Sequence, residues 1–412
     1  MATEPVTRAE STVVRDACVA AKEASRVLAR ADAQTRNAAL HAIAAALSER
    51  TAEVVAANDR DVKAATEAGI SAVLVDRLKL TPDRVAAIAF DVLSIAALPD
   101  PVGEVIEGRR LDNGLDLRKV RVPLGVVAVV YEARPNVTID CTALCLKSGN
   151  AIVLRGSSMA GASNAILVEI ARDAVASVGL PPASVSLIAG GGHEELPELV
   201  TQSEFLDLVI PRGGEGLKTV LKEHATVPVV YAASGNCHVF VDASAELADA
   251  VAIAVNAKIQ RPGVCNAAET LLVHSDVAVK FLPPALRALR ESGVELRADG
   301  RARVAAGELG DTITAATEED WATEFLALVL AVKVVDSVEE AIEHVNHYGS
   351  GHSEAIVTSS YESARAFTDG GQFGLGAEIG NSTQKLHARG PLGVRELCTF
   401  KYVVEGTGQV RP

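Results

Sequence analysis

The chain has 412 residues, 49% of them hydrophobic, with a formal net charge of −14 and a pI near 5.2. An acidic chain lacks the clustered Lys and Arg that bind nucleic-acid backbones and anionic membrane surfaces, so we expect neither as a partner. Its length exceeds the ~250 to 300 residues at which one hydrophobic core stops growing, which predicts two domains.

The chain start and the cysteines bear on the cellular compartment. Residues 1–10 lack the positive charge and apolar core of a secretory signal, and no uncharged apolar stretch reaches the ~18 residues that span a membrane. The six cysteines are too sparse for a disulfide framework. Cys141 and Cys145 lie four apart in a predicted helix without further ligands nearby, so we predict helix packing and no metal site. These features are typical of a cytoplasmic protein.

The first part of the chain follows a helical period and then changes. Residues 11–69 and 81–97 are rich in Ala and have apolar positions at helical spacing, which predicts several helices. Residues 115–122 alternate and follow the turn signal Asp112-Asn113-Gly114, which predicts a hairpin.

Short apolar runs separated by helical segments fill the rest of the chain. Such an alternation predicts parallel, doubly wound sheets covered on both faces, hence an α/β fold with two such domains. We expect buried strands at 126–131, 151–154, 185–188, 206–210, 227–231 and 238–241, and then near 270–273, 325–334 and 353–357.

Cys265 is the most informative single residue. It follows a Pro262-Gly263 turn between a helical stretch and the apolar strand 271–273, at an element end where catalytic side chains usually lie. A thiol in this position is either a nucleophile or a buried small residue, since free cysteine is also among the most buried residue types.

A glycine-rich loop follows the strand that ends at Ile210. Gly213 and Gly214 precede a predicted helix, where backbone N–H groups can approach a phosphate. The spacing is not Gly-x-Gly-x-x-Gly, so a tight turn between strand and helix explains the loop equally well.

Six motifs then occur in a fixed order. They are VVYEARPNVT at 129–138, IPRGG at 210–214, GNCH at 235–238, RPGVCN at 261–266, HVNHYGSGHSEAI at 344–356 and KLHARGP at 385–391. Together they resemble the gamma-glutamyl phosphate reductase family of the aldehyde dehydrogenase superfamily, from about residue 11 to the end of the chain.

The resemblance implies NADPH-dependent reduction of L-glutamate 5-phosphate to L-glutamate 5-semialdehyde, with release of phosphate, in proline biosynthesis. The Cys265 thiolate would attack the acyl carbon, and the resulting thioester would accept hydride. An aldehyde dehydrogenase-like fold is also implied, with a dinucleotide-binding domain at 1–258 and a catalytic domain at 259–395. An oligomerisation hairpin near 104–123 and a C-terminal strand at 396–412 belong to the first domain.

The same resemblance assigns roles to catalytic and substrate-binding residues. Asn136 matches the superfamily's oxyanion asparagine, with a plain turn residue as the alternative. Arg134 and Arg261 lie beside the two reactive motifs and suit a phosphoryl group or a carboxylate, or they are surface or interdomain arginines. His387 and Arg389 are candidates for gripping the glutamate end of the substrate.

Two further residues join Gly213 and Gly214 as candidates for cofactor binding. Arg155 occupies a strand end where relatives contact the adenosine ribose, and its charge favours the 2′-phosphate of NADPH; surface charge is the alternative. Glu324 resembles the glutamate that contacts the nicotinamide ribose, or it extends the acidic run 318–320.

One absence favours reduction over hydrolysis. Residues 231–236 carry no carboxylate, whereas hydrolytic aldehyde dehydrogenases have a water-activating glutamate in this motif. Without that base, the thioester should survive long enough to meet hydride.

The chain departs from the family after Phe367. A strand with a Val-Asn-Ala-Ser-Thr-like motif is expected before residues 368–371 and is missing. Loss of an interior strand leaves backbone groups of its neighbours unpaired. Two hypotheses follow: an active reductase that tolerates the gap, and a weakly active or inactive relative that serves as an oligomeric or glutamate-kinase-binding subunit.

The resemblance also predicts partners. In this superfamily, segments such as the hairpin near 112–122 and the alternating run 399–404 pair strands between subunits, which predicts a homo-oligomer; a simple edge ribbon is the alternative. Because the chain has no kinase domain, a separate glutamate kinase must supply the acyl phosphate. We expect transient association with that enzyme.

Overall fold

The computed structural model describes residues 12–189, 194–231, 235–360, 386–388 and 390–409, and the separate positions 379, 381, 382 and 384. Contacts between Cα atoms divide the chain into two compact units. Unit 1 comprises Met1–Tyr231, Phe373–Gly380 and Leu386–Pro412, and unit 2 comprises Ala232–Gln372 and Asn381–Lys385. Each unit has its own parallel sheet and hydrophobic core.

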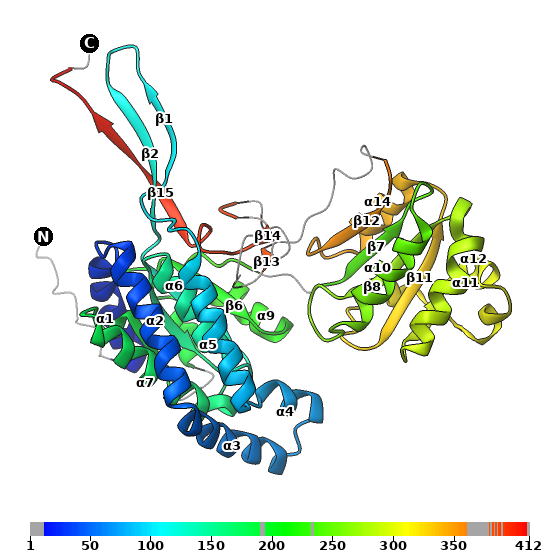
Figure 1. The fold of residues 1–412 in the computed structure, drawn as a ribbon, viewed down its shortest axis with the longest axis horizontal. Helices are drawn as coiled ribbons and strands as arrows, with labels where there is room; N and C mark the ends of the chain where they lie inside the picture. Colours follow the sequence, from blue (N-terminus) through cyan, green and yellow to red (C-terminus); the bar gives the residue numbers. More distant parts are fainter. Residues whose placement is uncertain are drawn as a thin grey trace, which may run out of the picture. The chain divides into compact units, whose positions relative to one another are not determined.

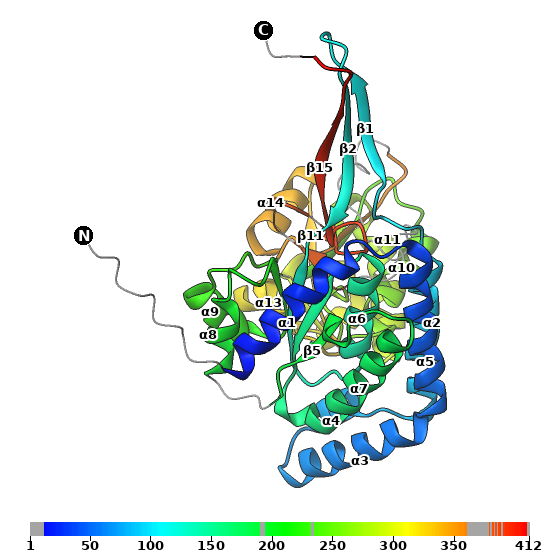
Figure 2. The same ribbon diagram turned by 90° about the vertical axis from the view of Figure 1, so that its left-hand side faces the viewer.

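Unit 1 starts with helices, three of which begin at side-chain caps. Thr12, Asp32 and Thr81 each accept a hydrogen bond from the backbone N–H three residues on, which satisfies a donor that the first helical turn leaves unpaired. Of the first five helices of unit 1, all but the fourth lie within the ranges predicted from the apolar spacing, 11–69 and 81–97 (Figures 1 and 2). The five helices are α1 (Val13–Leu28), α2 (Ala33–Glu49), α3 (Thr51–Glu67), α4 (Ala72–Leu78) and α5 (Pro82–Ala97).

The parallel sheet of unit 1 has the strand order β5-β4-β3-β6. All six side chains of β3 are buried, as expected for an interior strand covered on both faces. The strands are β3 (Val126–Tyr131), β4 (Ala151–Arg155), β5 (Val185–Leu187) and β6 (Leu208–Arg212). The helices between and after them are α6 (Asn136–Lys147), η1 (Ser158–Ala160), α7 (Gly161–Ser177), η2 (Pro182–Ser184), α8 (Glu195–Val200) and α9 (Glu215–His224).

This strand order creates a topological switch point between β3 and β6. From β3 the chain builds outward through β4 to β5, and it then returns to place β6 on the other side of β3. The strand predicted at 227–231 is wrong, because Val229 makes a single bridge with Val209 and the rest of the run does not pair as a strand.

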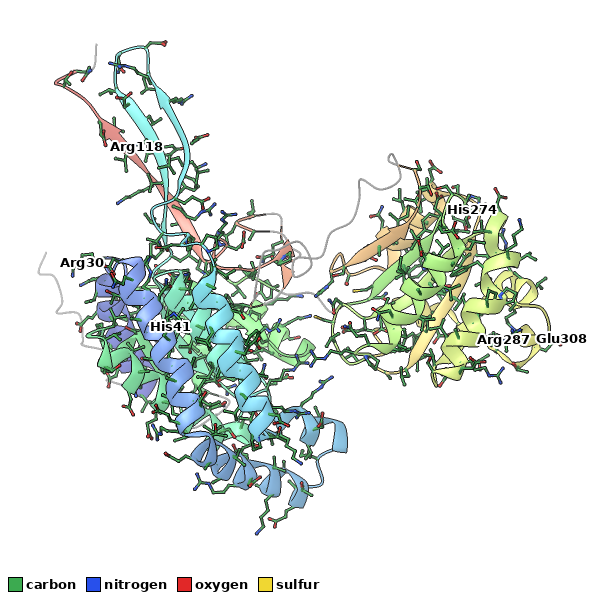
Figure 3. All side chains as sticks on the ribbon, in the orientation of Figure 1. Arg30, His41, Arg118, His274, Arg287 and Glu308 are labelled. Atoms are coloured by element: carbon green, nitrogen blue, oxygen red, sulfur yellow. The ribbon has the colours of Figure 1, made fainter. Side chains whose placement is uncertain are left out.

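A separate antiparallel sheet in unit 1 joins the predicted hairpin to the C-terminal run. β1 (Val105–Arg110) pairs with β2 (Asp116–Pro123), and β2 pairs with β15 (Cys398–Glu405) over its whole length. Arg118 of β2 and Glu405 of β15 form an exposed ion pair across the two strands, and Figure 3 shows Arg118 on this sheet.

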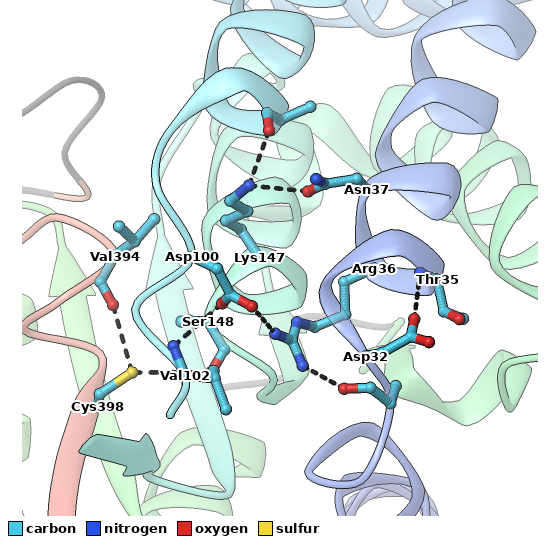
Figure 4. A network of polar contacts seen from close by, with 12 residues as sticks. Asp32, Thr35, Arg36, Asn37, Asp100, Val102, Lys147, Ser148, Val394 and Cys398 are labelled. Carbon is cyan, nitrogen blue, oxygen red and sulfur yellow. Dashed lines mark hydrogen bonds and ion pairs between the residues drawn. The ribbon is translucent and has the colours of Figure 1, made fainter. Parts of the chain in front are cut away.

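A buried polar network ties the base of this sheet to the helices (Figure 4). The Arg36 guanidinium of α2, which is 2% exposed, pairs with Asp100 at 2.5 Å, and Asp100 accepts from the backbone N–H of Val102. Lys147, at the end of α6, donates to Asn37 and to the carbonyl of Ala96. The network therefore holds the segment that leads into β1 against α2 and α6.

Unit 2 contains a parallel sheet of order β10-β9-β11-β8-β7-β12 with helices on both faces. Val239 and Val241 of β7 join the core formed with α10 and α11, while Phe240 joins the core formed with α14, because successive side chains alternate between faces. The strands are β7 (Cys237–Val241), β8 (Ala268–His274), β9 (Glu295–Ala298), β10 (Thr314–Ala315), β11 (Val329–Val335) and β12 (Glu354–Val357). The helices are α10 (Leu247–Ile259), α11 (Ser275–Glu291), α12 (Gly300–Ala305), η3 (Gly307–Thr312), α13 (Glu318–Ala322) and α14 (Val338–Tyr348). The short piece β13 (Asn381–Ser382) also belongs to unit 2, whereas β14 (Gly390–Pro391) belongs to unit 1.

The boundary between the units differs from the one drawn at residue 258 from the sequence. The structure divides the chain at Tyr231, because β7 pairs with β8 and β12 and so belongs to the second sheet together with α10. The apolar pattern identifies β7 and α10 as elements but does not say which strands β7 lies beside.

Candidate active site

Cys265 lies in a loop of unit 2 that connects the end of α10 to the start of β8. Two turn bonds shape the loop: the N–H of Val264 donates to Arg261 O, and the N–H of Ala267 donates to Val264 O. Cys265 is half-buried and Arg261 is exposed. A partly accessible thiol on a fixed turn is the setting of a reactive cysteine, whereas a structural cysteine is usually buried completely.

The loop rests against the glycine and cysteine of the GNCH motif. A Cβ on Gly235 would lie 1.4 Å from the carbonyl oxygen of Cys265, so only glycine fits this contact. The Gly235 N–H donates to Glu324 Oε1 at 2.7 Å, and Cys237 Sγ lies 3.2 Å from the Cys265 carbonyl oxygen. Glu324, predicted to contact the nicotinamide ribose, thus holds the backbone that supports the thiol loop.

A buried ion pair closes the base of the same loop, and sequence reasoning missed it. Lys258 at the end of α10 and Glu269 at the start of β8 are fully buried and 2.5 Å apart, and Lys258 also donates to the carbonyl of Ala268. Burial raises the pKa of Glu269 to about 7 and lowers the pKa of Lys258. The sequence signal for this pair is a charged residue on each side of the turn that carries Cys265: Lys258 before it and Glu269 after it.

In the described part of unit 2, His238, His344 and His352 are buried. His238 pairs with Glu354 at 3.0 Å, and the two residues are register partners on β7 and β12. His344 lies beside Lys333, and burial together with this lysine lowers the pKa of His344 to about 3, so it is neutral at physiological pH. His352 Nδ1 lies 2.9 Å from its neighbour Ser353 and 4.0 Å from Cys237 Sγ, inside the unit.

Asn136 of unit 1 is the first residue of α6 and is half-buried. Its Nδ2 donates to Asp140 Oδ2 at 2.9 Å, one helical turn on, which orients the amide and leaves its second N–H for another acceptor. Burial raises the pKa of Asp140 to about 6. Arg134 precedes Asn136 on the turn from β3, where its N–H donates to the carbonyl of Glu132. Asp140 was missed from the sequence because its role depends on Asn136.

The other predicted residues of unit 1 gather at the carboxyl edge of its sheet. Arg155 ends β4 and Arg212 ends β6, so an arginine ends the strand on each side of β3. Gly213 and Gly214 follow β6 at the switch point, and the Gly214 N–H donates to Glu132 Oε1 at 3.0 Å. A Cβ on Gly213 would lie 2.8 Å from that same carboxylate oxygen, so glycine allows Glu132 to approach.

The two remaining candidates lie on the stretch before β15. His387 is exposed, has a positive φ of 68°, and lies with Nε2 2.7 Å from the carbonyl oxygen of Glu396. Arg389 lies outside the described residues, as does the segment after Phe367 where the strand was expected.

Neither a metal site nor a membrane span emerges from the described ranges. They contain no group of three or more His, Cys, Asp or Glu residues arranged to hold a metal ion. Among these same residues, no helix has the length and apolarity needed to cross a bilayer.

Comparisons with known proteins decide the family. The model of the aldehyde dehydrogenase family matches residues 2–308. The gamma-glutamyl phosphate reductase of Thermobifida fusca is 50% identical, over 97% of this chain and 98% of the relative. That of Kineococcus radiotolerans is 51% identical over the whole of both chains. The crystal structure of the Thermotoga maritima gamma-glutamyl phosphate reductase is 44% identical with a TM-score of 0.91, over 97% of this chain and 100% of that one.

The chain belongs to the gamma-glutamyl phosphate reductases of the aldehyde dehydrogenase family. This confirms the resemblance carried by the six motifs and the aldehyde dehydrogenase-like α/β fold. Membership implies a nicotinamide cofactor.

One pairwise match shows that this chain lacks positions that a relative has. The alignment with the Kineococcus reductase is 431 positions long, whereas this chain has 412 residues, so that relative has positions without a counterpart here. The remaining chain nevertheless keeps half of its residues identical to those of this reductase. The inactive-subunit hypothesis is therefore not favoured.

Proposed function

We propose that this chain reduces L-glutamate 5-phosphate to L-glutamate 5-semialdehyde with NADPH, releasing phosphate, as a step of proline biosynthesis. The observation that carries the proposal is identity near 50% to gamma-glutamyl phosphate reductases over nearly the whole chain. The supported, half-buried Cys265 turn agrees with it.

Cys265 is the nucleophile in this proposal. Its thiolate adds to the acyl carbon of the substrate, the bond from that carbon to the phosphate oxygen breaks, and phosphate leaves with its electron pair. The product is a thioester on Cys265. After reduction of the thioester carbon, the carbon–sulfur bond breaks, which gives the aldehyde and regenerates the thiol.

Asn136 is the side-chain donor in this proposal, and its amide stabilises the oxygen that becomes negative in both steps. Preorganised donors of this kind act strongly because they need no reorientation when charge develops. The bond to Asp140 fixes the Asn136 amide in advance. Arg134, Arg261, His387 and Arg389 supply the charge and hydrogen bonds for the phosphoryl group and the glutamate carboxylate.

A phosphate-bearing dinucleotide suits the edge of the unit 1 sheet. The switch point, the small residues Gly213 and Gly214, and the two guanidinium groups of Arg155 and Arg212 fit its anionic groups. Since Glu132 occupies the Gly214 N–H, this carboxylate must move before a phosphate takes that donor. NADPH would supply the hydride when bound. Arg155 would favour its 2′-phosphate, and Glu324 would hold its nicotinamide ribose.

We also propose a cytoplasmic homo-oligomer that meets a glutamate kinase transiently. The β1-β2-β15 sheet supports the first point, because it exposes large apolar side chains that a subunit contact would cover. They are Val105, Ile106, Phe400, Tyr402 and Val404. Light scattering on the purified chain tests the oligomer, and trapping of free acyl phosphate in a mixed assay with the kinase tests channelling.

Phosphate-dependent reduction of NADP with glutamate semialdehyde tests the activity in reverse. The wild-type chain should be active and Cys265→Ala should be inactive, with both folded by circular dichroism. A wild-type rate no higher than that of Cys265→Ala would overturn the proposed function.

A further inference from the structure

Cys237 is a second thiol beside the reactive one, and the proposed chemistry leaves it without a role. It starts β7 and is 3% exposed. Its Sγ lies 3.2 Å from the carbonyl oxygen of Cys265, with the thiol as donor, and 4.0 Å from His352 Nδ1. Cys237 thus contacts the backbone of the nucleophile itself.

That contact bears on the direction of the Cys265 side chain. The carbonyl oxygen of Cys265 is enclosed by Gly235 on one side, where no Cβ fits, and by the Cys237 thiol. A fixed carbonyl fixes the plane of the peptide bond after Cys265. Cα is joined to that peptide by the single bond between Cα and the carbonyl carbon of Cys265. The directions in which Cβ and Sγ can leave the backbone are therefore restricted too.

Cys237 remains a hydrogen-bond donor instead of becoming a competing nucleophile. Burial, with the nearby charge of Glu354, raises the pKa of the Cys237 thiol far above its usual range. The protonated thiol keeps its S–H for the Cys265 carbonyl, and its low exposure keeps substrate away. Two cysteines 28 positions apart in the sequence therefore differ in role through their surroundings, since Cys237 is buried near Glu354 and Cys265 is half-buried.

We propose that Cys237 is a positioning residue for Cys265: its thiol holds the nucleophile's carbonyl and so aims the reactive sulfur at the acyl carbon. The inference rests on the proposed function of Cys265 as the nucleophile. It assigns Cys237 an effect on the rate of attack and none on the binding of substrate or cofactor.

Three variants separate the hydrogen bond from packing. Cys237→Val keeps a side chain of similar volume without a donor, and Cys237→Ser keeps a donor. We expect Cys237→Val to lower kcat by about three- to tenfold with KM unchanged, the size of effect that one neutral hydrogen bond produces, and Cys237→Ser to recover most of the loss. Cys18→Val, which removes a fully buried thiol of α1, is the matched control and should leave kcat unchanged.

A second readout is independent of turnover. The rate of alkylation of Cys265 by iodoacetamide, followed by mass spectrometry across pH 6 to 10, should fall in Cys237→Val by a similar factor and recover in Cys237→Ser. Equal kcat and alkylation rates in wild type and Cys237→Val would overturn the positioning role, as would a serine variant as slow as the valine one. If the wild type alkylates at Cys265 but lacks reductase activity, the proposed function fails while the positioning role is still judged by alkylation.

Discussion

In unit 2 the loop that carries Cys265 leaves α10 and enters β8 at the buried Lys258–Glu269 pair, whereas in unit 1 Asn136 is held by one hydrogen bond to Asp140. Both supports place a carboxyl group away from water. Burial raises the pKa of both carboxyls, to about 7 at Glu269, which has the Lys258 ammonium 2.5 Å away, and to about 6 at Asp140, which accepts from the Asn136 amide. The two reactive groups should therefore respond differently to loss of charge and to pH.

The largest effect is expected from breaking the ion pair on one side only. Glu269→Leu leaves the Lys258 ammonium buried without its counter-charge, which should lower the free energy of unfolding by about 3–5 kcal/mol. The double variant Lys258→Met with Glu269→Leu removes both charges and should recover most of that loss. Urea unfolding measures both. Equal losses in the single and double variants would contradict the electrostatic explanation and indicate lost packing.

Loss of the Asn136 amide should leave the fold intact and affect the chemistry. Asn136→Ala removes a donor to the developing oxyanion, which should lower kcat by about 10²–10³-fold with a small change in KM. Steady-state kinetics with a circular dichroism melt as control checks this. A large rise in KM at constant kcat would instead assign Asn136 to substrate binding.

Parts of this comparison were predictable from the sequence. The buried run 126–131 and the turn at Pro262-Gly263 gave β3 and the Cys265 loop, because period and turn residues are local signals. Lys258 and Glu269 were not foreseen, since their pairing depends on how a helix end and a strand start meet around a loop. Asp140 was missed for a similar reason: a carboxyl four residues after an asparagine pairs with it only if both lie on one helix face.

The strand predicted wrongly at 227–231 also shows that local sequence signals do not establish pairing. Its apolar residues are largely buried, as the pattern indicated, but burial does not give a strand the neighbours it needs for a ladder. The boundary near Tyr231 likewise follows from which strands β7 pairs with. Sequence period identifies elements, and lateral pairing assigns them to sheets.

A pH-dependent effect of intermediate size is expected at Asp140. Its pKa of about 6 in the folded chain lies above the usual 3.8, so the folded state binds the proton more tightly than the unfolded state does. The stabilisation is complete below pH 4 and is lost as pH rises through 6. Asp140→Asn should therefore be more stable than wild type at pH 7.5, by about 3 kcal/mol, and this advantage should shrink toward pH 4.5. A difference that stays constant with pH would show that the carboxyl does not titrate in this range.

The smallest effect is expected where a charge pair is exposed to water. Arg118 and Glu405 link β2 to β15, with side chains 44% and 59% exposed, so solvent and salt screen their attraction. Glu405→Gln should change the free energy of unfolding by less than about 1 kcal/mol, and 0.5 M salt should remove most of that difference. Glu269→Gln, measured in the same way, should lower the free energy of unfolding by several times more. Salt should change this loss little, because its partner Lys258 is fully buried. If both variants lost the same free energy of unfolding, burial would not explain the difference between the Lys258–Glu269 pair and the exposed Arg118–Glu405 pair.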